Sequence, residues 1–327
     1  MTESAFPSNS DICIIGPAIC DVLAGPVSHD PFGRGTQPME QIRISYGGNG
    51  LNEAVILSRL GQPVELISCI GDDETGERVL SFLKRNGVST KHIVRDRFIP
   101  TGVNIVLVDE KGERCFLTNP SGSLRMLSEK HILPQLEQTG KIVCFSGMFI
   151  SPLLDVPAME RIFKKIRGKP GRILAVDMTS AKHGETIAEL RSLLQMVDVI
   201  FPNEKELYLL TGKDDPVQGA RALVECGAGC AVVKLGARGC ILQTRNLTAQ
   251  IPSWPVARAV DTTGAGDCFA AGFLWAMNNQ LPLTDCARFA CACASCVVER
   301  FGATEGLTSL EEPMRRFHMM KKSEQEG

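Results

Sequence analysis

The chain has 327 residues, 44% of them hydrophobic, and its 35 basic side chains nearly balance its 37 acidic ones. This composition excludes a disordered, collagenous or coiled-coil protein. A net charge of −2 leaves no broad cationic surface, so neither nucleic acid nor an anionic membrane is expected as a partner. We therefore expect a folded protein whose partner is a small molecule.

The thirteen cysteines indicate a reducing compartment rather than a disulfide framework. Their number is odd, and most lie in apolar runs, where a free cysteine packs as a small hydrophobic side chain. Cys293 and Cys296 have the spacing of a metal-binding pair, but no second pair accompanies them, which favours core packing. No secretory pattern is visible, and the longest apolar stretch, residues 287–298, is too short to span a membrane. These observations predict a cytoplasmic location.

Short apolar runs alternate with longer helical patterns along the chain. The predicted strands are residues 11–15, 64–70, 142–146, 173–177, 199–201, 231–234 and 240–243. The predicted helices are residues 52–60, 75–86, 157–166, 186–196, 203–211, 216–226, 266–278 and 284–300. This alternation is typical of βαβ units and predicts an α/β fold, with a mostly parallel sheet covered by helices on both faces.

Two stretches, about 22–46 and 98–119, interrupt this alternation because neither has a helical period. The second is typical of a hairpin, with strands at 102–108 and 113–117. We expect one domain, residues 1–327, into which both stretches insert a small β-sheet lid that closes over a ligand. Both faces of the first hairpin strand are largely apolar. One face is therefore expected to cover the ligand and the other to pack against a second copy of the chain in a homodimer.

The most informative segment runs from Asp261 to Asp267, with the sequence Asp-Thr-Thr-Gly-Ala-Gly-Asp, directly before a helical pattern. Gly264 and Gly266 permit a tight turn and the close approach of a ligand to the backbone. The first amides of the following helix point out of its N-terminus, where the helix dipole also favours a phosphate group. The carboxylate of Asp267 can reach the same point. We interpret this corner as a phosphoryl-transfer site rather than a purely structural turn.

A second glycine-rich corner, from Tyr46 to Ala54, also leads into a helix. It does not fit the dinucleotide-binding pattern GxGxxG, because Glu53 stands in place of the third glycine, and no P-loop pattern occurs in the chain. Asn49 and Asn52 offer amide donors and acceptors that suit neutral hydroxyl groups. This corner predicts a site for a sugar or another polyol.

Together the two corners resemble the ribokinase-like (pfkB-type) carbohydrate kinase family. Residues 47–52, Gly-Gly-Asn-Gly-Leu-Asn, are similar to its N-terminal signature, and residues 261–267 to its C-terminal one. The similarity extends over nearly the whole chain. It implies a three-layer α/β/α ribokinase-like (Rossmann-like) core with a small β-sheet lid. It also implies an ATP- and Mg²⁺-dependent kinase that acts on a hydroxyl group of a sugar, sugar acid or nucleoside.

The resemblance also implies roles for individual residues. Asp267 matches the catalytic base, and the backbones of Gly264, Ala265 and Gly266 match the anion hole. The substrate-binding positions correspond to Asp21, Gly47, Gly48, Asn49, Asn52 and Asn104. The ATP-binding positions correspond to Asn203, Lys234, Gly236, Gly239 and Cys291. Glu206 matches the residue that organises the water ligands of Mg²⁺. A K⁺-binding loop corresponds to Asp261, Thr263, Val297, Arg300 and Gly302.

Ile19, Asn49 and Cys291 depart from the pattern of ribose kinases, which carry Asn, Lys and Asn at these positions, and each change removes a polar contact. A buried polar partner left unpaired costs about 1–3 kcal/mol, so ribose is not expected as the substrate. The matched pocket positions contain no Lys or Arg, which argues against a sugar that already carries a phosphate. Arg114, on the second lid strand, either closes over a substrate carboxylate or faces solvent.

The predicted reaction is transfer of the ATP γ-phosphoryl group to a hydroxyl, expected to be primary, of an unphosphorylated monosaccharide or sugar acid. A nucleoside kinase is the first alternative, but no aromatic residue falls at a matched sugar position to stack on a base. The second alternative is a catalytically silent sugar-binding regulator. Such a protein would keep Asp21 and Asn52 but could lose Asp267, which is present.

Overall fold

The computed structural model describes residues 12–27, 35–36, 38–109, 114–182 and 184–326; the side chains of residues 114 and 324–326 lie outside this description. It contains a nine-stranded sheet in the order β13-β12-β11-β10-β9-β8-β1-β4-β5. Its strands are β1 (Ile12–Ile15), β4 (Val64–Gly71), β5 (Ile93–Asp96), β8 (Ile142–Met148), β9 (Ile173–Met178), β10 (Val199–Phe201), β11 (Cys230–Lys234), β12 (Cys240–Thr244) and β13 (Thr248–Ile251). Only the pairs β11–β12 and β12–β13 are antiparallel, so the predicted, mostly parallel sheet is confirmed.

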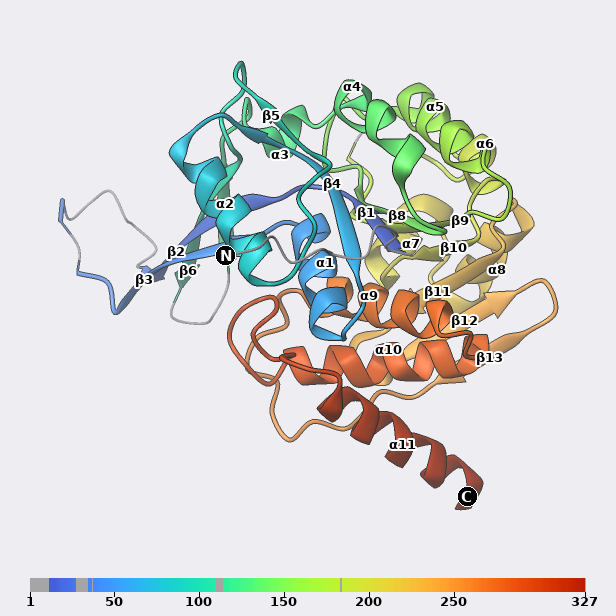
Figure 1. Cartoon of the computed structure of the whole chain (residues 1–327). Helices are drawn as coiled ribbons and strands as arrows, with labels where there is room; N and C mark the ends of the chain where they lie inside the picture. Colours follow the sequence, from blue (N-terminus) through green and yellow to red (C-terminus); the bar gives the residue numbers. More distant parts are fainter. Residues whose placement is uncertain (1–11, 28–34, 37, 110–113, 183, 327) are drawn as a thin grey trace, which may run out of the picture.

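Helices cover both faces of this sheet (Figure 1). One face carries α1 (Asn49–Arg59), α2 (Glu74–Arg85), α9 (Ala265–Asn278), α10 (Leu283–Val297) and α11 (Glu311–Glu326). The other carries α3 (Ser123–Met126), α4 (Glu129–Ile132), η1 (Leu133–Gln138), α5 (Val156–Arg167), α6 (Arg191–Leu194), α7 (Glu204–Thr211) and α8 (Pro216–Glu225). Along β1, Ile12 and Ile14 pack in the first core, and Cys13 and Ile15 in the second. Burial on both faces explains why this strand is an uninterrupted apolar run, and the three-layer α/β/α prediction is confirmed.

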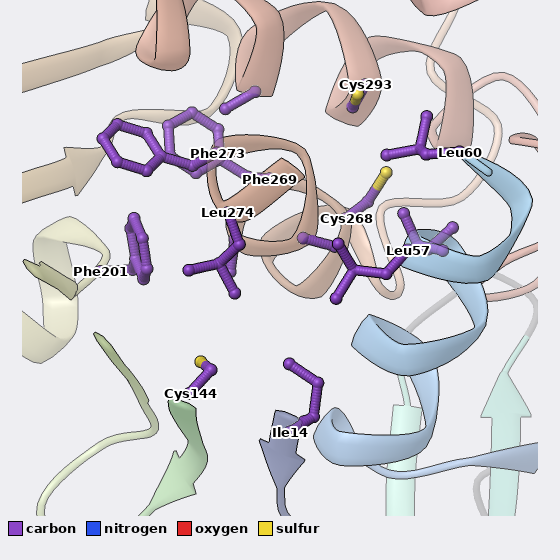
Figure 2. Close-up of a cluster of buried hydrophobic side chains, with 14 of the residues drawn as sticks. Ile14, Leu57, Leu60, Cys144, Phe201, Cys268, Phe269, Phe273, Leu274 and Cys293 are labelled. Atoms are coloured by element: carbon purple, nitrogen blue, oxygen red, sulfur yellow. The ribbon is translucent and has the colours of Figure 1, made fainter. Parts of the chain in front are cut away.

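The core beneath α9 holds in place the glycine-rich turn that precedes this helix. Figure 2 shows Phe269 and Phe273 of α9 beside Phe201 of β10, with Leu57 of α1 near Cys268. The Phe201 and Phe273 rings meet edge to face, with their centroids 5.2 Å apart. Because α9 is buried on nearly every side, its first turn is presented from a rigid support.

All thirteen cysteines are free thiols, and all but Cys115 are buried. Burial raises the pKa of thiols such as Cys69 and Cys230 to about 12, so they remain neutral core side chains. The prediction of core packing is thereby confirmed. No helix in the described part of the chain combines the length and the apolar character needed to cross a membrane.

A separate four-stranded sheet, in the order β3-β2-β6-β7, forms the lid and projects from one side of the body (Figure 1). Its strands are β2 (Ile19–Val27), β3 (Gln41–Gly47), β6 (Val103–Asp109) and β7 (Arg114–Thr118). The expected hairpin is present as β6 and β7, while residues 110–113 of its turn lie outside the described residues. The register aligns Val22, Ile44, Ile105 and Leu117 in one row across the sheet. That face is apolar and open, with Ile44 53% exposed.

The helix predicted over residues 186–196 is wrong in its first half, since only Arg191–Leu194 are α-helical. The backbone N–H of Ile187 instead donates to the carbonyl of Leu210 at the end of α7, 3.1 Å away. In a continuous helix the N–H of Ile187 would point along the helix axis, so it could not reach the carbonyl of Leu210. The local apolar period alone could not reveal this tertiary contact.

Candidate active site

The two glycine-rich corners, more than 200 residues apart in the sequence, meet at the carboxylate of Asp267. Nδ2 of Asn49 donates to its Oδ1 and Nδ2 of Asn52 to its Oδ2, both at 2.7 Å. Asn49 and Asn52 are three residues apart on α1 and therefore share one helix face, while Asp267 lies in the first turn of α9. Each oxygen of the carboxylate thus accepts a hydrogen bond from a side-chain amide, and the two bonds fix its orientation.

The pKa of Asp267 is raised to about 6, first because the group is buried and second because the charge of Asp177 lies nearby. The hydrogen bonds from Asn52 and Asn49 favour the ionised form and partly offset this rise. A carboxylate with this pKa is ionised at neutral pH and still able to accept a proton. It therefore has the properties of a general base.

Two further carboxyl groups, which the sequence analysis did not assign to the site, surround Asp267. Carboxylate oxygens of Glu53, Asp177 and Asp267 all lie within 4.8 Å of one another, and all three residues are buried. Ser146 donates to Oε1 of Glu53, while Oε2 has no partner among the described residues. Burial, together with the charges of Asp177 and Asp267, raises the pKa of Glu53 well above its usual range. Glu53 is therefore the group of this cluster best suited to hold a proton.

Lys234, at the end of β11, supplies the balancing positive charge. Its Nζ lies 2.6 Å from Oδ1 of Asp177. Burial alone would lower the pKa of Lys234, but the charges of Asp177 and Glu206 outweigh it and raise the pKa. A Cβ atom at Gly266 would lie 3.3 Å from Nζ, so this glycine leaves room for the ammonium group beside the start of α9. The N-terminus of the helix and Lys234 thus present positive charge to the same space.

Gly264 caps α9 in a left-handed conformation, with φ of +73°, and a Cβ there would lie 2.3 Å from the carbonyl oxygen of Ala303. Only glycine fits both constraints. The amide of Ala265 donates to the carbonyl of Thr262 at 3.2 Å, and that of Cys268 to Gly264 at 2.8 Å. By helix geometry the amides of Gly266 and Asp267 have no acceptor within α9. These two amides are the best placed to meet an anion.

The lid contributes a second polar pair. Nδ2 of Asn104 on β6 donates to Oδ1 of Asp21 on β2 at 2.9 Å, and burial raises the pKa of Asp21. A Cβ at Gly47 would lie 2.4 Å from Oδ2 of Asp21, and Gly48 caps α1 with φ of +93°. The structure thus places these predicted sugar residues together at the point where the lid joins α1. Arg114 lies on β7, but its side chain is outside the described residues.

Asn203 and Glu206 form a reciprocal cap at the start of α7. The Glu206 amide donates to Oδ1 of Asn203 at 2.9 Å, and the Asn203 amide donates to Oε2 of Glu206 at 2.8 Å. Burial, partly offset by the charge of Lys234, raises the pKa of Glu206 to about 7. This carboxyl group is oriented and lies near the Lys234–Asp177 pair.

The predicted nucleotide loop surrounds a short turn, η2 (Gly236–Arg238), and both Gly236 and Gly239 have positive φ. A Cβ at Gly239 would lie 2.0 Å from the carbonyl oxygen of Ile251. Cys291 on α10 is buried, and its thiol lies 3.9 Å from that of Cys240, the residue after Gly239. The predicted residues Gly236, Gly239 and Cys291 therefore lie close together in the structure. Their role in ATP binding stays a prediction.

The predicted cation loop is closed by Asp261. Its Oδ1 accepts from the amide and hydroxyl of Thr263, and its Oδ2 accepts from the amide of Gly302 at 3.0 Å. The carbonyl of Val297 accepts from the amide of Arg300. The segment 297–302 therefore lies against the turn that precedes the anion site. Binding of K⁺ there stays a prediction.

The open N-terminus of α9, the oriented carboxylate of Asp267 and the polar residues of the small sheet together form the arrangement expected of a phosphotransferase that acts on an alcohol group. The chain belongs to the pfkB family of carbohydrate kinases, whose family model matches residues 9–310. Relatives include a ribokinase from Haemophilus influenzae, 29% identical over 84% of this chain and 88% of the relative, and fructokinase-2 from Solanum lycopersicum, 28% identical over 82% and 85%. The protein is a sugar kinase of this family.

Solved structures confirm the fold. A putative ribokinase II from Escherichia coli, in its apo form, has a TM-score of 0.81 and 24% identity, covering 95% of this chain and 99% of that one. The ribokinase of Arabidopsis thaliana, in a complex with ribose and ATP, has a TM-score of 0.79 and 24% identity, covering 94% and 99%. The ribokinase-like core and the separate small sheet are therefore confirmed.

The activity is expected to fall below about pH 6, by about tenfold per pH unit, because Asp267 must be ionised to accept a proton and its pKa is about 6. Measuring kcat/KM between about pH 5 and 8 tests this. Asn49→Ala removes a hydrogen bond that favours the ionised carboxylate, so its acidic limb is expected at higher pH. Glu206 also titrates near neutrality but does not contact Asn49. A limb that does not move in this variant would show that another group controls it.

Proposed function

We propose that this sugar kinase transfers the γ-phosphoryl group of ATP to a primary hydroxyl group of an unphosphorylated monosaccharide or sugar acid. The observation that carries the proposal is the carboxylate of Asp267, held by Asn49 and Asn52 beside the open N-terminus of α9. A base and an anion site placed together are what in-line phosphoryl transfer requires.

In the proposed reaction, Asp267 accepts the proton of the attacking hydroxyl as the new P–O bond forms and the bond to the leaving nucleotide breaks. The amides at the start of α9 and the ammonium of Lys234 face the negative charge that develops on the phosphoryl oxygens. Asn49 and Asn52 hold the base in position. Closure of the lid over the sugar would exclude water and limit ATP hydrolysis.

ATP and Mg²⁺ are proposed as donor and cofactor. A structural neighbour from Escherichia coli, a putative ribokinase II, is described in complex with ATP and Mg²⁺. In this chain the oriented carboxylate of Glu206 is the group proposed to hold Mg²⁺ through water, since carboxylate oxygens are ligands that Mg²⁺ prefers. When bound, the metal supplies positive charge to the phosphate oxygens. Asn203, Lys234, Gly236, Gly239 and Cys291 are the proposed nucleotide contacts, and K⁺ the proposed ligand of the loop at Asp261.

The substrate class is inferred from the charge of the pocket. Asp21, Asn104, Asn49 and Asn52 offer a carboxylate and three amides, which suit neutral hydroxyl groups. The Oδ1 atom of Asn104 is buried without a partner among the described residues, so it remains available to a hydroxyl donor. None of these positions carries the cation that a sugar phosphate would need. Arg114 is the proposed contact for the carboxylate of a sugar acid.

The decisive experiment is an ADP-release assay of the purified enzyme with Mg²⁺·ATP, against monosaccharides, sugar acids, sugar phosphates and nucleosides, each in K⁺, Na⁺ and Tris. We expect activity with an unphosphorylated sugar or sugar acid, higher in K⁺ than in the other two. Activity confined to nucleosides or sugar phosphates would overturn the substrate class. Equal rates in all three buffers would contradict the proposed binding of K⁺ at the Asp261 loop. Absence of activity with every class of substrate would contradict the proposed reaction.

We also propose a homodimer that forms through the lids. Ile44 and Ile105, from strands on either side of β2, are 53% and 43% exposed on the same face, and an open apolar sheet face favours pairing. Sedimentation at micromolar concentration is expected to give the mass of two chains. Ile44→Asp with Ile105→Asp is expected to give one chain, whereas Leu153→Asp, an exposed leucine outside the lid, should leave the dimer intact. A parent protein that sediments as a monomer would contradict this.

A further inference from the structure

A cavity that has no part in the proposed reaction lies away from the active site. Its volume is about 910 Å³, within the range of about 300–1,000 Å³ that is usual for small-molecule sites. Three arginines line it, and we call it the arginine pocket: Arg191 at the start of α6, Arg221 on α8, and Arg245 in the turn between β12 and β13.

The positive charge of this pocket is only partly neutralised by the protein. Within the part of the chain that the structure describes, none of the three arginines forms an ion pair, and the pocket contains a single acidic residue, Glu225. Several other surface arginines form ion pairs, as Arg167 does with Asp198 and Arg238 with Glu204, whereas these three line one cavity without one. The three guanidinium groups and the carboxylate of Glu225 leave this lining with two excess positive charges, in a chain whose net charge is −2.

The pocket lies at the opposite edge of the sheet from the catalytic residues. Its lining residues 224–229 come directly before β11, and Gln195 comes shortly before β10. Asn203 and Lys234 stand at or just beyond the other ends of these two parallel strands. A ligand in the arginine pocket would thus be separated from the active site by the length of the strands, and would not compete with the sugar or with ATP there.

We propose that the arginine pocket binds a small anion that carries phosphate groups. Guanidinium groups match phosphate oxygens through paired hydrogen bonds, and several of them around one cavity favour a ligand with more than one negative charge. The remaining lining supports a small organic ligand, because Gln195, Asn246 and Thr248 offer polar groups and Val224 and Leu247 an apolar surface. The site is assigned from this geometry and does not depend on which sugar the enzyme phosphorylates.

Inorganic pyrophosphate is the probe for this site, measured by isothermal titration on the full chain with the active site saturated by a non-hydrolysable Mg²⁺·ATP analogue. We expect one site per chain, weakened by at least about tenfold in Arg221→Gln/Arg245→Gln. The control, Arg85→Gln/Arg258→Gln, removes the same charge from two exposed arginines outside the pocket and should bind as the parent does. Because all four side chains are exposed, urea midpoints and KM for ATP should not change.

Absence of pyrophosphate binding up to about 10 mM would overturn the proposal, as would unchanged binding by the folded pocket variant. Equal weakening in the pocket and control variants would also overturn it, because the effect would then reflect overall charge. Such a ligand could be either a phosphorylated sugar or a nucleotide. Repeating the titration with a sugar phosphate and with ADP distinguishes these two classes. In each case, the part of the binding that Arg221→Gln/Arg245→Gln removes belongs to the pocket.

Discussion

Asp267→Asn is expected to lower kcat by at least about 10²–10⁴ while leaving the fold intact. The amide has nearly the shape of the carboxylate, so the residue should still pack between Asn49 and Asn52, but it cannot accept the proton of the attacking hydroxyl. The loss should appear in kcat rather than in KM, because the base acts on a proton that moves only in the transition state. Steady-state rates by ADP release, with the sugar found in the substrate assay, measure it.

The matched control is Asp214→Asn, which makes the same chemical change at an exposed position before α8. It should keep the parent rate. Urea unfolding and nucleotide binding should show that the Asp267 variant is folded and still binds ATP. If this folded variant keeps kcat within about threefold of the parent, another group must take the proton and the assignment of the base is wrong.

The main parts of the site could be predicted from the sequence because each is encoded locally. A glycine pair followed by a helix specifies an anion site within seven residues, from Asp261 to Asp267, and Asn49 and Asn52 share a helix face by their spacing alone. The structure adds how the two corners meet. The amides of Asn49 and Asn52 orient the base itself, a relation between residues more than 200 positions apart that no local pattern contains.

Glu53 and Asp177 were missed because their importance depends on the tertiary fold. Glu53 was interpreted only as a residue that breaks a dinucleotide pattern, and Asp177 as the end of a predicted strand. A signal was present, because Asp177 lies one residue before the carboxyl end of a buried parallel strand, at the sheet edge where α/β proteins bind ligands. Glu53 is a fully buried acidic residue on a helix, which is rare without a partner or a function.

Two edge strands that were not predicted, β5 and β13, have weak local patterns. Strand β5 has the sequence Ile-Val-Arg-Asp and lies at the edge of the sheet, so it lacks the continuous apolar run of β1 or β4. Strand β13, Thr248–Ile251, is a short edge strand that is largely open to solvent. Edge strands need burial on fewer sides, and their sequences are therefore less constrained.

Lys234→Met is expected to lower the free energy of unfolding by about 3–5 kcal/mol, because it leaves the buried carboxylate of Asp177 without its cation. Methionine is similar in length to lysine, so the change removes charge more than volume. Urea unfolding measures the difference. The control is Lys205→Met, at an exposed position on α7, which is expected to change the stability by less than about 0.5 kcal/mol.

The double variant Lys234→Met/Asp177→Asn is expected to recover most of the lost stability, because it removes both charges of the pair. The pH dependence gives an independent check on Lys234→Met. Without its cation, buried Asp177 is expected to have a still higher pKa in the folded state, while the unfolded carboxyl titrates near its usual value. The folded state then binds the additional proton, so this variant should lose stability, relative to the parent, as the pH rises from about 4 to 7. If the single variant is as stable as the parent, or if the double variant is no more stable than the single one, the Lys234–Asp177 pair does not hold this side of the active site together.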